Sequence, residues 1–153
     1  MWIDILKPLE PLVMSFVAAA AFGIIYNVPR VTVWAGGFAG MIGWIVYKGL
    51  SSEGRLDSVF ATIAATFVVA MICQHFARRY KMPVIVFSIA GIIPMVPGGT
   101  AYNAMREFVE NNHGLALQYA SEACLVSGAI AFGLLLGGVF TQIIKKQSEP
   151  TMR

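Results

Sequence analysis

Long uncharged stretches alternate along this chain with short charged ones. Asp, Glu, Lys and Arg are absent from five apolar segments: Pro11–Pro29, Val31–Tyr47, Ser58–Ala77, Met82–Tyr102 and Ala123–Ile144. Several of these reach the roughly 17–25 residues that a helix needs to cross a bilayer. The pattern predicts an integral membrane protein of the all-α class, a polytopic bundle of transmembrane helices surrounded by lipid.

About five spans are predicted, or four if one segment does not cross. We expect a single transmembrane domain over residues 1–146 and a polar C-terminal tail over residues 147–153. The expected spans are Leu9–Tyr26, Val31–Leu50, Ser58–Phe76, a fourth that begins after Pro83, and Ala120–Ile144.

The fourth span is interrupted by the sequence PMVPGGT. From Pro83 to Val96 a helix covers only about 21 Å of a hydrocarbon core of roughly 30 Å. Pro94 and Pro97 each remove one helical hydrogen bond, so the chain breaks where it is still apolar. The segment therefore predicts two half-helices that meet near the middle of the membrane.

The residues after the prolines predict how the second half-helix begins. Gly98 and Gly99 permit backbone angles closed to other residues, and Thr100 is a good N-cap. Free N–H groups at that end are partially positive, and broken helices of this kind bind carboxylates in transporters. The hypothesis is a substrate site of Pro94, Pro97, Gly98, Gly99, Thr100 and Asn103. The alternative is a proline kink that only shapes the bundle.

Periodicity places Thr100, Asn103, Glu107 and Glu110 on one face of this half-helix, opposite Ala101, Ala104, Met105 and Phe108. We expect the polar face to line water. Glu107 is a candidate coupling group, although it also suits the aqueous end of the helix.

Four other polar residues are candidates for coupling or gating. Asn27 and Arg30 flank Pro29 between the first two spans, His75 precedes a basic edge, and Glu122 opens the last span. His75 or Glu122 would serve as a proton carrier, or each is an ordinary interfacial residue. No nucleophile–base pair, metal-ligand cluster or phosphate-binding loop is apparent, so neither an enzyme nor a cofactor nor a metal is expected.

Small residues recur at four-residue steps, as at Gly36 and Gly40 of the second expected span, which lets helices approach closely. In the last span Ala129, Gly133 and Gly137 form such a stripe. The stripe predicts a packing face for a partner chain.

Charge is scarce and bears on topology. Only 12% of residues are charged and the net charge is +3, with nothing to indicate a nucleic-acid partner. Five crossings place four basic residues on one side and seven on the other. Because basic residues favour the cytoplasm, the C-terminus is predicted on the cytoplasmic side of a bacterial inner membrane. The smaller set is Lys7, Lys48, Arg55 and Arg106, and the larger is Arg30, Arg78, Arg79, Lys81, Lys145, Lys146 and Arg153.

Three features of the chain are similar to those of a known membrane-protein family. They are the stretch FGIIYNVPR at 22–30, the stretch IPMVPGGTAYNAM at 93–105 and a glycine-rich last span. The chain resembles the small membrane subunit of the bacterial threonine/serine exporter family, equivalent to the C-terminal half of single-chain exporters. The resemblance implies a larger membrane subunit as partner. It makes Pro94, Pro97, Gly98, Thr100 and Asn103 the core motif, with Asn27 and Pro29 as a second.

The resulting functional hypothesis is a secondary-transporter subunit that exports small carboxylate-bearing metabolites, with threonine and serine first. A C4-dicarboxylate such as succinate is the alternative substrate, because the resemblance includes a branch linked to succinate export. A non-transporting scaffold for the larger subunit and a channel formed by a homo-oligomer remain open.

The basic-residue count makes a direct prediction of orientation. A reporter fused after Arg153 should report a cytoplasmic location, and Ser52→Cys should react with an impermeant thiol reagent added outside intact cells. Reaction of Ser52→Cys only after permeabilisation would reverse the orientation.

Overall fold

A computed structural model describes residues 9–51 and 57–148. In these two ranges the chain is helical and contains no strand, which confirms the all-α prediction. The elements are α2 (Leu9–Ile25), α3 (Arg30–Ser51), α4 (Ser58–Tyr80), α5 (Val84–Ile92), a 3₁₀ turn η1 (Ile93–Met95), α6 (Gly98–Val109) and α7 (His113–Ser148).

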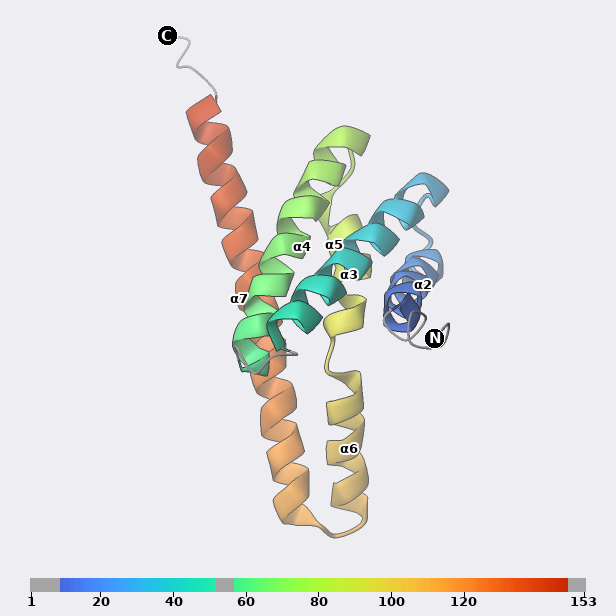
Figure 1. The fold of residues 1–153 in the computed structure, drawn as a ribbon, viewed down its shortest axis with the longest axis vertical. Helices are drawn as coiled ribbons and strands as arrows, with labels where there is room; N and C mark the ends of the chain where they lie inside the picture. Colours follow the sequence, from blue (N-terminus) through green and yellow to red (C-terminus); the bar gives the residue numbers. More distant parts are fainter. Residues whose placement is uncertain (1–8, 52–56, 149–153) are drawn as a thin grey trace, which may run out of the picture.

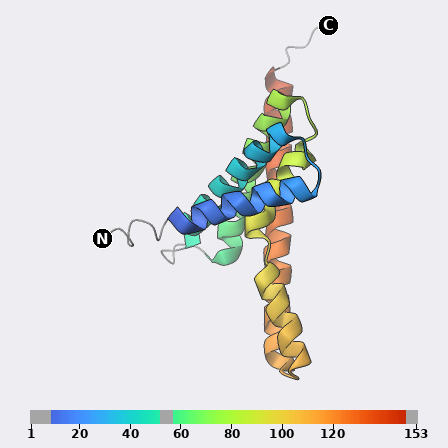
Figure 2. The same cartoon turned by 90° about the vertical axis from the view of Figure 1, so that its right-hand side faces the viewer.

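The helices form a bundle from which one hairpin extends. Helix α4 packs along α7, α3 packs against α2, α4 and α5, and α2 crosses the others at a steep angle (Figures 1 and 2). Helix α6 and the N-terminal part of α7 lie side by side and project away from the remaining helices (Figure 1). The break between η1 and α6 therefore lies where the bundle gives way to the hairpin.

Three helices end in the same way, on a residue in the left-handed conformation. Asn27, Lys81 and Asn111 have φ values of 55°, 53° and 62°. In each case the N–H of the following residue donates to a carbonyl five residues back: Val28 to Gly23, Met82 to Ala77 and Asn112 to Glu107, at 3.0, 3.0 and 2.9 Å. This geometry satisfies terminal carbonyls, and Pro29 or Pro83 then prevents two of the helices from continuing.

The core of the bundle is built from small side chains. Its buried residues include Ala35 and Ala39 of α3, Ala65, Val69 and Cys73 of α4, Phe87 of α5 and Met95 of η1. Glycines of α3 mark close approaches to neighbouring helices. A Cβ on Gly36 would lie 2.9 Å from that of Ala90, and one on Gly40 would lie 2.8 Å from that of Ala19. The predicted close packing through small residues is confirmed for α3.

The stripe of Gly133 and Gly137 has a different role from the one predicted. A Cβ on Gly133 would lie 2.7 Å from the carbonyl oxygen of Ile63 in α4, and Gly137 faces Ala70 of the same helix. The prediction of a face for a partner chain is therefore wrong, because α4 of the same chain occupies it. Helix α4 strengthens this contact with a hydrogen bond from Nε2 of Gln74 to the carbonyl of Gly137, at 3.1 Å.

The number of spans is tested by helix length and composition. Within the described ranges, Ser58–Tyr80 and His113–Ile144 are each long and apolar enough to cross a membrane. The bent pair Val84–Met95 and Gly98–Val109 makes a third if it forms one span, while α2 has 17 residues and is shorter. Five crossings therefore stay a prediction.

The contact between α4 and α7 predicts the effect of a leucine at Gly133. Gly133→Leu should overpack the interface and destabilise the protein by roughly 1–3 kcal/mol or more. Gly128→Leu is the matched control, since a Cβ there meets nothing within 4 Å among the described residues. Membrane abundance and thermal stability in detergent should fall for the first variant only. Equal behaviour of the two variants would contradict this packing.

Candidate functional site

The predicted discontinuity at PMVPGGT is present. Helix α5 ends at Ile92, η1 adds one 3₁₀ turn, and Val96 is extended with φ −64° and ψ 129°. Helix α6 then begins at Gly98, and the two halves meet at a bend of 56°.

The backbone around the bend satisfies some of its polar groups locally. Pro97 cannot donate to the carbonyl of Ile93, but the N–H of Val96 does so at 3.2 Å. The N–H of Gly98 donates to the carbonyl of Val96 at 2.8 Å, and that of Ala101 donates to Pro97 at 3.0 Å. Within the described part of the chain, the N–H groups of Gly99 and Thr100 find no carbonyl partner. These two donors are what the bend leaves open.

Two local predictions at the bend are wrong. Thr100 is not the N-cap: Pro97 precedes the first helical residue, and no side chain caps α6. Gly98 and Gly99 do not have positive φ values, so they are not needed for unusual backbone angles. A Cβ on either would meet nothing within 4 Å among the described residues. Packing inside this chain therefore does not require glycine at either position.

Packing of the prolines and Met95 fixes where the bend lies in the bundle. Met95 is buried, and a Cβ on Gly43 would lie 2.9 Å from its Cε atom. The same Cβ would contact Val69, near the middle of α4. Pro94 approaches α3 at Gly40, where the corresponding distance is 3.3 Å. The first half of the broken segment is thus held at mid-bundle, and the first turn of α6 opens away from it.

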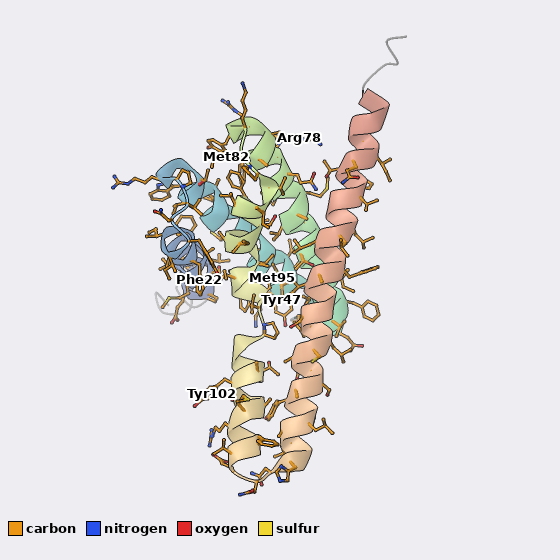
Figure 3. The ribbon with its side chains drawn as sticks, turned by 180° about the vertical axis from the view of Figure 1, so that it is seen from behind. Phe22, Tyr47, Arg78, Met82, Met95 and Tyr102 are labelled. Atoms are coloured by element: carbon orange, nitrogen blue, oxygen red, sulfur yellow. The ribbon has the colours of Figure 1, made fainter. Side chains whose placement is uncertain are left out.

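Helix α6 exposes its large apolar side chains, whereas three of the four residues of the predicted polar stripe are less exposed and only Glu110 is exposed. Thr100, Asn103 and Glu107 are half-buried. By contrast, Tyr102, Met105, Phe108 and Val109 are exposed by 67%, 69%, 62% and 76%. Tyr102 points away from α7 (Figure 3). This arrangement suits a helix whose outer face contacts lipid or another protein rather than water.

Glu107 near the end of α6 and Glu110, which follows its last residue, have partners close to the turn into α7. Oε2 of Glu107 accepts a hydrogen bond from Nδ2 of Asn112 at 2.9 Å. Oε1 of Glu110 pairs with Nε of Arg106 at 2.9 Å, and this pair is exposed. Both acids therefore have their side-chain partners at the end of the hairpin, away from the bend.

The remaining candidates lie in three different places. Asn27 and Arg30 line one cavity between α2 and α3, whose lining includes no residue of the bend. His75 is exposed on α4 beside the ring of Phe76, with ring centroids 6.2 Å apart. Glu122 of α7 lines a shallow hollow with Asp57 at the start of α4. Among the described residues no group of three or more His, Cys, Asp or Glu side chains gathers as metal ligands would.

Sequence reasoning missed the aromatic wall of the Asn27–Arg30 cavity. Phe16 of α2 lies against Trp34 of α3 with ring centroids 5.7 Å apart. The nearest signal was Trp34, four residues after Arg30, but its partner is brought close only by the packing of α2.

Comparison with known families decides the class of the protein. Residues 11–140 match the family model described as Threonine/Serine exporter, ThrE. The chain belongs to the threonine/serine exporter family. It is thus a membrane protein of a transporter family, as the broken helix and the apolar spans indicate.

One relative allows a comparison of length. An uncharacterized protein of Haemophilus influenzae is 32% identical over 145 residues, which cover 90% of this chain and 48% of that protein. The chain spans about half the length of this relative. No solved structure matches the chain.

Proposed function

We propose that this chain is one subunit of a secondary transporter that exports small carboxylate-bearing metabolites, with threonine and serine the leading substrates. The proposed site is the first turn of α6. The observation that carries the proposal is the pair of open N–H groups, on Gly99 and Thr100, at a bend between two half-helices.

The chemistry of this turn matches a carboxylate. The N-terminal end of α6 carries a partial positive charge and two donors that point out of the helix. A backbone donor left unpaired in hydrocarbon costs several kcal/mol, so such a break is tolerated where it lines a cavity or is covered by protein. Asn103, one turn further along α6, supplies an amide that donates or accepts a further hydrogen bond.

The free space beside Gly98 and Gly99 favours a binding site over a simple proline kink. In a kink that only shapes the bundle, glycine would be needed for backbone angles or for packing, and neither Gly98 nor Gly99 serves these purposes in this chain. Close approach of a substrate or of a partner subunit explains both residues. A C4-dicarboxylate is the second candidate substrate, since its first carboxylate would use the same donors.

A larger membrane subunit of the same family is the proposed partner. The chain spans about half of its relative, and α6 exposes a row of large apolar side chains. A second subunit that covers this row would also close the site beside Gly99. A homo-oligomer is the rival arrangement, and a scaffold without transport is the rival function. We place the protein in the bacterial inner membrane with its C-terminus in the cytoplasm.

Export measurements with matched glycine variants test the site. Gly99→Val should reduce efflux of threonine or serine from loaded cells, because a side chain would block the approach to the N–H groups. Gly114→Val is the control: it is likewise the second residue of a helix, and a Cβ there also meets nothing within 4 Å among described residues. Equal efflux from the two variants at equal membrane abundance would exclude the site.

Asn103→Leu tests the side chain that completes the site. Loss of one hydrogen bond worth about 1 kcal/mol should weaken transport about fivefold at subsaturating substrate, with membrane insertion unchanged. Normal export from a well-inserted Asn103→Leu variant would support the kink. If every variant reduces export only because less of the protein is present in the membrane, a scaffold function without transport is favoured.

A further inference from the structure

The cavity lined by Asn27 and Arg30 lies between α2 and α3, apart from the bend. Its volume is about 610 Å³, and most of its lining is apolar. Phe16 and Trp34 form one wall, with their ring centroids 5.7 Å apart. The lining residues are Phe16, Ala20, Ile24, Asn27, Val28, Arg30, Val33 and Trp34.

The polar members of this lining gather at the turn between the two helices. Arg30 is the first residue of α3 and is exposed, with no ion-pair partner among the described residues. Asn27 is exposed in the left-handed conformation that ends α2. The cavity is thus an apolar groove with a cation and an amide at one end.

We propose that this groove binds one anionic phospholipid. Its phosphate would contact the guanidinium of Arg30 and the amide of Asn27, and one acyl chain would lie along Phe16, Ala20 and Ile24. A guanidinium binds phosphate oxygens through two parallel donors, which favours Arg30 as the headgroup ligand.

The position of the groove agrees with a lipid ligand. The turn at Asn27 joins α2 and α3, the helices of the first two predicted spans. If both cross as the sequence predicts, Arg30 lies at the depth of lipid headgroups. Trp34 is exposed by 65% one turn beyond Arg30, and tryptophan is enriched at that depth. The predicted topology puts this turn on the cytoplasmic side, where anionic lipids attract basic residues.

Selection among lipids depends on the headgroup. The groove and the bilayer are about equally apolar. Moving an acyl chain from the bilayer into the groove therefore adds little to the binding free energy. The charge of Arg30 is the feature that distinguishes anionic from zwitterionic lipids. Because the groove shares no lining residue with the bend, this site is separate from the proposed substrate site.

Native mass spectrometry tests the proposal. The purified full chain is released from nanodiscs of mixed phosphatidylglycerol and phosphatidylcholine, and the lipid that stays bound is identified. We expect phosphatidylglycerol to be retained in preference, and Arg30→Gln to reduce this preference about fivefold. Arg78→Gln is the control, because Arg78 is an exposed arginine at the end of α4 and does not line the groove. Inorganic phosphate should not displace the lipid.

Ala20→Phe supplies a second variant that keeps Arg30 and fills the groove. It should lose the bound lipid while eluting as a single monodisperse species. Equal retention of the two lipids by the unaltered protein would overturn the proposal, and so would equal losses in Arg30→Gln and Arg78→Gln. Displacement by inorganic phosphate, or retention by a monodisperse Ala20→Phe variant, would also overturn it.

Discussion

The need to pair every backbone polar group inside a membrane governs this structure. An unpaired N–H or carbonyl in hydrocarbon costs several kcal/mol, and Pro94 and Pro97 remove two helical donors within four residues. The chain recovers part of this loss by a 3₁₀ turn and by the hydrogen bonds of Val96 and Gly98. What it leaves unpaired, at Gly99 and Thr100, is the basis for proposing a site there.

Small side chains let the helices pack closely around the broken segment. Gly36, Gly40 and Gly43 bring α3 against α2, α5 and η1, so that the shortened first half-helix is held from one side. Helix α4 supports α5 through Val69 and Cys73, and Gly133 and Gly137 bring α7 against α4. The same helices then leave α6 exposed. The chain spans about half the length of its relative, and the exposed apolar side chains of α6 are the surface on which the proposed partner subunit would pack.

The fold could be predicted from the sequence where single segments determine it. Leu9 and Ser58 begin the helices expected there, and the break follows from two prolines whose effect is local. Thr100 failed as an N-cap because Pro97 already takes the position before the helix, so the helix begins three residues earlier than predicted. Gly133 was assigned to the wrong neighbour because a small-residue stripe shows that a helix approaches and not which one.

The candidate sites could be predicted only in part, because the sequence does not show which helices pack against each other. Periodicity predicted the polar stripe of α6, but the half-burial of Thr100, Asn103 and Glu107 depends on how α6 packs in the hairpin. Likewise, Asn27 and Arg30 stood out as polar residues, while their groove exists because α2 brings Phe16 beside Trp34.

Accessibility of the first turn of α6 tests the central claim most directly. In a variant with Cys73 and Cys124 replaced by alanine, Thr100→Cys should react with a hydrophilic thiol reagent, since a site for a carboxylate must admit water. Added threonine or serine should slow this reaction, whereas Tyr102→Cys on the outer face should show no such protection. If Thr100→Cys stays unreactive in the inserted and assembled transporter, or if no carboxylate substrate slows its reaction, the break is not the substrate site.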